Sequence, residues 1–438
     1  MGIRSFLKGP GRLFYGWRIV GLGAIANAVG GGIYQYGFAI FFLPITKDLN
    51  LSRAATSLVF SLSRAEGAVE GPLAGWLVDK FGPRHILFGG ALLTGLGYLL
   101  LAQINSFGAF LLVYVGVISL GFNGGFAHTV ITAVNSWFVR RRGFAMSVTL
   151  SAFSLGGGIL APFLSFLVQR FGWRTASVVG GLAIWALVMP ASLGLKRSPE
   201  SIGLAPDGDP LPTLEHPARH PANLDFTVGQ ALRNSSYWWL AFATTLRLAV
   251  VNVISVHFVP LMVWKGTSEP TAALLLSAMA FLSIPARIGL GWVGDRAPKY
   301  YIIAIGMFMG VASFVLLQFA QGMWQLWAFV ILFAIVEGVN PLNWALVGDF
   351  FGRTSFATLR GVMGLVYTLG TVVAPVATGL LYDETRSYAL VLWALAAIYG
   401  LGAAAFALLR APQQTLRTPA LETTGKVAAL EGESRYHD

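Results

Sequence analysis

Long runs of apolar residues dominate this sequence and limit what it can fold into. Backbone polar groups inside a bilayer must be satisfied within their own segment, so a crossing needs about 20 mostly apolar residues in helical form. Such runs cover residues 17–43, 54–78, 86–103, 108–136, 143–168 and 174–195, and then 237–264, 271–293, 300–319, 323–349, 361–382 and 388–410. The sequence therefore predicts an all-α integral membrane protein with twelve transmembrane helices.

The composition excludes a water-soluble globule. Charged residues make up 11% of the chain, whereas about 25% of the residues of a soluble protein are charged. The absence of cysteine excludes disulfides, catalytic thiols and thiolate metal sites. The six histidines are scattered between His85 and His437, so we expect no metal centre, no cofactor and no enzymatic activity.

The net charge of +11 is explained by the position of the basic residues relative to the spans. Lys and Arg near span ends are retained on the cytoplasmic side of a membrane. If the N-terminus is inside, six of the 30 Lys and Arg lie in outer loops and three lie within spans, at Arg64, Arg247 and Arg287. We therefore expect both termini to be cytoplasmic and the protein to be a monomer in the inner (plasma) membrane. The basic residues face the lipid bilayer surface, and we expect no nucleic-acid partner.

The two sets of six spans repeat one another. Residues 75–84 read GWLVDKFGPR after the second span, and residues 291–299 read GWVGDRAPK after the eighth, 216 positions later. Arg142-Gly143 and Arg360-Gly361 repeat more loosely at the entries of the fifth and eleventh spans. This pattern predicts two pseudo-symmetric six-helix bundles.

The remaining segments are polar. Residues 196–234 are rich in proline, which favours an irregular cytoplasmic linker between bundles at 1–195 and 235–410. Residues 411–438 lack the apolar surface needed to offset the entropy of ordering, so we expect a disordered cytoplasmic tail.

The repeated loop resembles the signature of the major facilitator superfamily: a Gly, three residues, an Asp, a basic residue, one residue, a Gly and further basic residues. The resemblance implies twelve helices in two bundles and transport by alternating access. It also implies gating roles for the charged residues of both copies, which are Asp79, Lys80, Arg84, Asp295 and Arg296. A carboxylate there can accept hydrogen bonds from a neighbouring helix end or pair with a basic residue; the alternative is a tight turn anchored by charges.

A narrower resemblance is to the monocarboxylate transporters and oxalate/formate antiporters. It depends on Tyr15-Gly16-Trp17, on WFVRRRG at 137–143, and on an Arg eight residues before the second signature Asp, which is Arg287. His257 matches a histidine that lines the substrate cavity in bacterial relatives of that branch. The sequence departs from the animal transporters at Ser283, where they have an Asp, so the usual proton site is missing. It also has Gln35 where those relatives have a Lys, and no Lys in the eleventh span where oxalate antiporters use one, so we expect a monoanion rather than a dianion.

Arg287 is the candidate anion-binding residue. Ionisable side chains at mid-bilayer cost about 2.5–3.5 kcal/mol and usually mark a functional path. A guanidinium binds a carboxylate through two parallel hydrogen bonds. The alternative is a structural ion pair with Glu337, and Arg247 is either a second substrate cation or the partner of Glu337.

Glu66 and Glu70 of the second span are the candidate proton-coupling residues, together with Glu337. Their spacing of four places both carboxylates on one helix face, and neighbouring carboxylates favour binding of a proton. In the alternative reading, Arg64 and a neighbouring helix neutralise them permanently.

Several polar residues fall on spans that line the central cavity in the superfamily. These candidate substrate contacts are Tyr34, Asn123, Asn340, Asn343 and Tyr367, although such residues also bridge packed helices. The glycine runs 30–32 and 156–158 predict close helix packing. The function that fits best is secondary transport of a small organic anion, coupled to a proton. The alternatives are an exporter of hydrophobic or drug-like compounds and, from another class, a channel or sensor.

Overall fold

The computed structural model describes residues 14–51, 53–209 and 225–412, and the regular structure of these residues is helical. The first bundle contains α2 (Tyr15–Gly30), η1 (Gly31–Tyr36), α3 (Gly37–Asp48), α4 (Arg53–Phe81), α5 (Pro83–Leu101), α6 (Phe107–Val113), η2 (Tyr114–Ser119), α7 (Leu120–Phe122), η3 (Asn123–Ala127), α8 (Thr129–Trp137) and α9 (Arg142–Leu193). The second contains α11 (Ser235–Trp264), α12 (Glu269–Gly294), α13 (Lys299–Gln318), α14 (Met323–Glu337), α15 (Asn340–Phe351), α16 (Phe356–Thr385) and α17 (Ala389–Ala407). We call them the N-terminal and C-terminal bundles.

The predicted twelve spans are confirmed. By length and hydropathy, nine helices of the described residues qualify as membrane spans, and a tenth is formed by α2–η1 and α3, which are bent by 42° relative to each other. Helix α9 has 52 residues and is broken at Gly172 (φ 81°, ψ 162°), a backbone conformation that favours glycine, so it crosses twice. Helix α4, with 29 residues, is long enough to cross but carries several charges.

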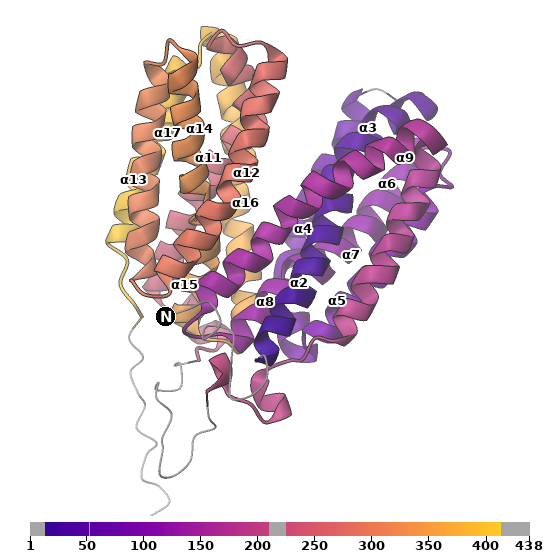
Figure 1. Cartoon of the computed structure of the whole chain (residues 1–438), viewed down its shortest axis with the longest axis vertical. Helices are drawn as coiled ribbons and strands as arrows, with labels where there is room; N and C mark the ends of the chain where they lie inside the picture. Colours follow the sequence, from indigo (N-terminus) through magenta and orange to yellow (C-terminus); the bar gives the residue numbers. More distant parts are fainter. Residues whose placement is uncertain (1–13, 52, 210–224, 413–438) are drawn as a thin grey trace, which may run out of the picture.

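The two bundles meet near one end of the molecule and diverge towards the other (Figure 1). At the end where they meet, α4 of the N-terminal bundle packs on α16 and α9 packs on α12 and α15. The described linker residues, 196–209 and 225–234, lie at this same end (Figure 1). We call it the closed end, and the opposite end the open end.

The linker follows an irregular path over its described residues. Two short 3-10 helices, η4 (Pro199–Ile202) and η5 (Pro206–Gly208), precede α10 (Val228–Leu232), which leads into α11. Residues 210–224 of the linker, residues 1–13, and the part of the predicted tail at 413–438 lie outside the described residues.

The two glycine runs lie against each other, as predicted for close packing. A Cβ on Gly156 would lie 2.0 Å from the carbonyl oxygen of Ala28, and one on Gly32 would lie 2.8 Å from that of Gly156. Both contacts are to backbone, which cannot rotate away. This contact brings α9 against α2 and η1 in the centre of the N-terminal bundle.

We expect Gly156→Ala to lower the free energy of unfolding by about 1–3 kcal/mol, because overpacking forces neighbouring backbone apart. Thermal unfolding of the purified protein in detergent measures this effect. Gly21→Ala on α2 is the matched control, since a Cβ there meets nothing within 4 Å. Equal melting temperatures for the two variants would contradict the packing argument.

Candidate functional site

Asp79, at the end of α4, caps a helix of the other bundle. Its Oδ2 accepts hydrogen bonds from the amide and hydroxyl of Thr358, at 2.8 and 2.7 Å, and its Oδ1 accepts one from the amide of Ala357 at 3.2 Å. These donors belong to the first turn of α16. A carboxylate at a helix N-terminus satisfies amides that have no partner within the helix and complements the helix dipole.

Asp295 makes the reciprocal contact. It follows α12, and its two carboxylate oxygens accept hydrogen bonds from the amides of Gly143 and Phe144 at 2.7 and 3.0 Å, at the start of α9. Burial raises the pKa of Asp295 to about 6, against the lowering effects of Lys299 and the two amides. The carboxyl is therefore mostly ionised at neutral pH and can accept both bonds.

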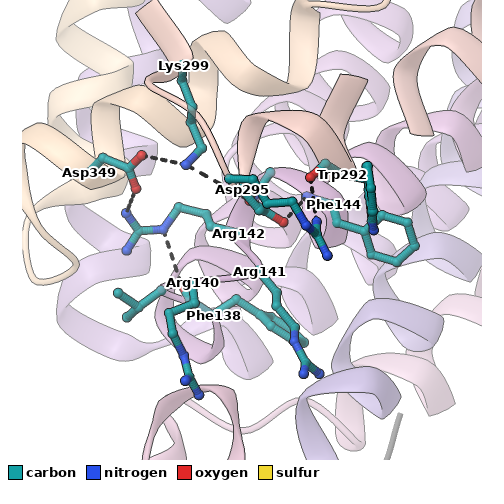
Figure 2. A network of polar contacts seen from close by, with 12 residues as sticks. Phe138, Arg140, Arg141, Arg142, Phe144, Trp292, Asp295, Lys299 and Asp349 are labelled. Atoms are coloured by element: carbon teal, nitrogen blue, oxygen red, sulfur yellow. Dashed lines mark hydrogen bonds and ion pairs between the residues drawn. The ribbon is translucent and has the colours of Figure 1, made fainter. Parts of the chain in front are cut away.

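A buried charge network surrounds the Asp295 cap (Figure 2). Asp349 at the end of α15 accepts from Arg142 at 2.7 Å and lies 2.8 Å from the ammonium of Lys299. Arg142 is fully buried and also donates to the carbonyl of Phe138 at 3.1 Å. The network joins the N-terminal bundle, through Arg142, to two helices of the C-terminal bundle.

Small residues allow the capped helices to approach closely. A Cβ on Gly75 of α4 would lie 2.2 Å from the carbonyl of Ala357, and one on Gly361 would lie 2.2 Å from that of Gly71. On the other side of the molecule, a Cβ on Gly291 of α12 would lie 2.8 Å from the carbonyl of Gly143. The caps and these crossings together hold the two bundles at the closed end.

The basic residues of the signature, for which we predicted a gating role, lie beside tryptophan rings or on the surface in this conformation. The ammonium of Lys80 lies 4.5 Å from the ring of Trp76, and the guanidinium of Arg296 lies 3.8 Å from the ring of Trp292. Arg84 is exposed on the first turn of α5. Lys and Arg of this kind, stacked on interfacial Trp, anchor span ends, whereas Lys299 and Arg142 supply the cations near the Asp295 cap.

The linker adds further contacts to both bundles at the closed end. Asp207 accepts from the amides of Val139 and Arg140 at 3.0 and 2.9 Å, in the turn between α8 and α9. Arg353 donates to the carbonyl of Ser136 and to Glu200, both at 2.8 Å. Burial raises the pKa of Glu200, but hydrogen bonds from its own amide, Ser198 and Arg353 outweigh this and lower it. A cavity of about 260 Å³ lies between the two bundles and the linker residues Arg197, Ser198, Glu200 and Asp225.

Arg287 lies in the second half of α12, and its side chain is 14% exposed. Its Nη1 donates to the hydroxyl of Ser154 on α9 at 3.0 Å, and its Nη2 is 3.8 Å from Oε2 of Glu337. Within the described part of the chain, Nε of Arg287 and Oε1 of Glu337 have no hydrogen-bond partner. The guanidinium therefore contacts both bundles and keeps unused donor capacity.

Arg247 belongs to the interior of the C-terminal bundle. It is 1% exposed and donates to Oδ1 of Asn340 at 2.7 Å. Asn343, one turn further along α15, is fully buried and accepts from the hydroxyl of Thr244 at 3.2 Å. The two asparagines predicted to contact substrate thus bond to α11 in this conformation, and Asn343 differs from that expectation because it faces away from the accessible surface.

Glu66 and Glu70 lie in a polar network inside the N-terminal bundle. Oε2 of Glu66 accepts from the hydroxyl of Ser119 at 2.7 Å and from the amide of Asn123 at 3.2 Å. Oε1 of Glu66 and Oε2 of Glu70 have no hydrogen-bond partner among the described residues. The two residues lie one turn apart on the same face of α4. Neighbouring carboxylates repel each other when both are ionised, which favours binding of a proton by one of them.

Arg64 does not neutralise this pair. Its guanidinium lies 5.0 Å from the ring of Phe60, and neither Glu66 nor Glu70 forms an ion pair with any described residue. Tyr34, predicted to line a cavity, is 2% exposed and donates to Ser119 at 3.2 Å instead. It is therefore a buried member of the Glu66 network.

Three π-helical turns converge on this network. Tyr34 lies in η1, Ser119 in η2 and Asn123 in η3. A π turn redirects side chains within a helix and is frequent at functional sites. Periodicity in the sequence gave no sign of these turns, and Ser119, which joins Tyr34 to Glu66, was not predicted as a site residue.

His257 and Tyr367 lie apart from this network. The two ring nitrogens of His257 are 3.2 Å from the hydroxyl of Tyr388 and 3.0 Å from the carbonyl of Pro375. Tyr367 on α16 packs edge to face on Trp344, at 5.9 Å between ring centres. The structure thus places the polar candidates in separate groups around Arg287, around Glu66, and on α11 and α16.

Comparison with known proteins decides the family. The sequence matches the family model described as Major Facilitator Superfamily over residues 20–366, and again over residues 266–432. The chain belongs to this superfamily. The resemblance inferred from the repeated GWLVDKFGPR segment is confirmed.

Its curated relatives are monocarboxylate transporters. Monocarboxylate transporter 3 of Rattus norvegicus is 27% identical over 406 residues, which cover 90% of this chain and 80% of the relative. Monocarboxylate transporter 13 of Bos taurus is 25% identical over 384 residues, covering 85% and 84%. Monocarboxylate transporter 7 of Homo sapiens is 25% identical over 442 residues, covering 86% and 84%. The narrower resemblance to this branch is also confirmed.

Solved structures show the same fold. The fucose:proton symporter FucP of E. coli superposes with a TM-score of 0.69 at 15% identity, covering 91% of this chain and 98% of that chain. A second structure of FucP, in the outward conformation, gives a TM-score of 0.65 at 16% identity, covering 89% and 96%. This superfamily member is a multi-pass membrane transporter with the twelve-helix fold, and it is not an enzyme.

Proposed function

We propose that this transporter carries a small organic monocarboxylate across the plasma (inner) membrane by alternating access, together with a proton. Arg287 supports this proposal most strongly. Its guanidinium lies in the second half of α12, is partly accessible, and has an Nε–H that no described residue accepts. A carboxylate fits such a group through two charge-assisted hydrogen bonds. The relatives named monocarboxylate transporters support the same substrate class.

The surplus of Lys and Arg on one side supports cytoplasmic termini, with the closed end in the cytoplasm. The structure would then correspond to the outward-open conformation. In this arrangement Asp79 and Asp295 act as gating residues, since their caps join the bundles on the cytoplasmic side and must break before the transporter can open inwards.

The proton site we propose is the pair Glu66 and Glu70. Its support is that the two carboxyls are one turn apart on one face of α4, which favours binding of a proton, and that neither forms an ion pair with a described cation. Glu337 is the second candidate, because it competes with the substrate carboxylate for Arg287 and a proton on it would release the guanidinium.

Uptake of radiolabelled monocarboxylates into proteoliposomes, with and without an inward acid gradient, tests this function. We expect saturable uptake that the gradient drives. Uptake of hydrophobic cations with no competition from any carboxylate would overturn the proposal. It would favour an exporter, because a cavity for cationic substrates is acidic rather than basic.

We expect Glu66→Gln or Glu70→Gln to abolish the stimulation by the acid gradient while exchange of labelled for unlabelled anion continues. The amide cannot take up the proton, but it leaves Arg287 untouched. Gln169→Glu, at an exposed position of α9 just beyond the end of a span, is a control for a change of charge outside the Glu66 network. Retained stimulation in both Gln variants, with its loss in Glu337→Gln, would move the proton site to Glu337.

A further inference from the structure

The guanidinium of Arg287 has one edge that is hydrogen-bonded and one that makes only a long ion pair with Glu337. Nη1 donates to the hydroxyl of Ser154 at 3.0 Å. The opposite edge, made by the N–H groups of Nε and Nη2, has an Nε without a partner among the described residues and an Nη2 that is 3.8 Å from Glu337. In a planar guanidinium, these two N–H groups point in parallel and form a fork that fits a carboxylate.

Ser154 and Arg287 belong to different bundles. Ser154 lies on α9, and Arg287 lies on α12. These helices touch from the closed end, where a Cβ on Gly143 would lie 3.0 Å from the carbonyl of Gly291, to Gly158, where a Cβ would lie 3.5 Å from Phe281. Ser154 lies within this stretch, so opening of the closed end must part it from Arg287. A hydrogen bond is lost once its atoms separate beyond about 3.5 Å.

We propose that Ser154 is a positioning residue, which presents the Nε–Nη2 edge of Arg287 to the anion only while the closed end is closed. While Ser154 accepts a hydrogen bond from Nη1, the side chain of Arg287 is fixed before the substrate arrives. The anion then binds without the entropy cost of ordering the Arg287 side chain. Once α9 and α12 have parted, this support is gone and the anion leaves more easily. The inference rests on the proposed function and adds that affinity differs between the two sides of the membrane.

The expected change in affinity on loss of the Ser154 hydroxyl follows from the entropy cost of immobilising one long side chain. That cost is about 0.5–1.5 kcal/mol, which corresponds to a change of roughly 2- to 12-fold in affinity. Because the contact between Ser154 and Arg287 exists in one conformation, we expect the affinity to change only for substrate that binds from the open end. A residue with a merely structural role would change stability or the maximal rate on both sides.

The test compares the KM for a labelled monocarboxylate in right-side-out and inside-out membrane vesicles. We expect Ser154→Ala to raise the KM in right-side-out vesicles by roughly 2- to 12-fold and to leave the KM in inside-out vesicles unchanged. Ser154→Thr keeps the hydroxyl and should restore the wild-type KM. Ser151→Ala is the matched control, since Ser151 lies one turn away on α9, is 2% exposed and has no hydrogen-bond partner for its hydroxyl among the described residues.

Three outcomes would overturn the inference. An unchanged KM in Ser154→Ala, or an equal change in both vesicle types, would remove the one-sided role of Ser154 while leaving the proposed function intact. A Ser154→Thr variant that behaves like Ser154→Ala would remove the role of the hydroxyl. Absence of saturable monocarboxylate uptake by the wild type would instead end the proposed function, and the inference with it.

Discussion

Replacing Arg287 with Lys is expected to reduce kcat/KM for monocarboxylate uptake by about 10- to 100-fold, because hydrogen bonds to charged groups contribute about 1.5–3 kcal/mol. Lysine keeps the charge but is a point donor and cannot offer the two parallel N–H groups of the Nε–Nη2 edge. A single ammonium also cannot replace the two separate edges of the guanidinium, of which one bonds to Ser154 and the other can bind a carboxylate. Proteoliposome uptake over a range of substrate concentrations measures the loss.

Arg287→Ala should abolish uptake altogether. It removes the cation and leaves Glu337, 15% exposed, without the partner that now lies 3.8 Å away; an uncompensated carboxylate repels an incoming anion. Arg64→Ala is the matched control, since Arg64 is also in a span but packs on Phe60 at 5.0 Å. Equal losses in the two variants would show a general need for positive charge rather than a binding role for Arg287.

Removing the caps is the second change with a large expected effect. In Asp295→Asn, the side-chain amide offers one acceptor oxygen and brings an NH₂ group against the amides of Gly143 and Phe144, so charge-assisted bonds of about 1.5–3 kcal/mol are lost. Asp79→Asn has the same effect at Thr358. Each variant should shift the population towards a conformation with the closed end open by at least about tenfold, and the double variant further.

The shift can be measured as a distance distribution between spin labels. The chain has no cysteine, so a single pair of cysteines introduced across the closed end carries both labels. Measurements at pH 8 keep Asp295 ionised in the reference protein, because its pKa is about 6. Asp383→Asn, at an exposed position near the end of α16, is the control. An unchanged distribution in the double variant would show that the caps do not hold this end closed.

The spans and the two caps could be predicted from the sequence because each has a local signal. A run of 20 apolar residues identifies a span wherever it occurs. Asp79 and Asp295 repeat in the same loop of both halves, and a carboxylate that follows one helix is well placed to cap another. Arg287 was identified by its charge in mid-span, and the structure shows it beside both Glu337 and Ser154.

The partners of these residues could not be predicted, because they come from distant parts of the chain. Ser154 is 133 residues from Arg287, and Asp349 is 207 residues from Arg142; neither has a neighbouring motif that marks it. The burial of Tyr34 and Asn343 was missed for another reason. A transmembrane helix is apolar on all sides, so its periodicity does not show whether a polar side chain faces a cavity or a neighbouring helix.

Both caps join a side chain of one bundle to peptide groups of the other. Asp295 bonds to the main-chain amides of residues 143 and 144, and Asp79 bonds to those of residues 357 and 358. Amino-acid changes at the receiving positions leave the amide in place, except for a change to proline. At Phe144 and Ala357 the caps therefore need only the main-chain amide. Gly143 and Thr358 are constrained, because a Cβ on Gly143 would lie 2.7 Å from Oδ1 of Asp295 and the hydroxyl of Thr358 also donates to Asp79.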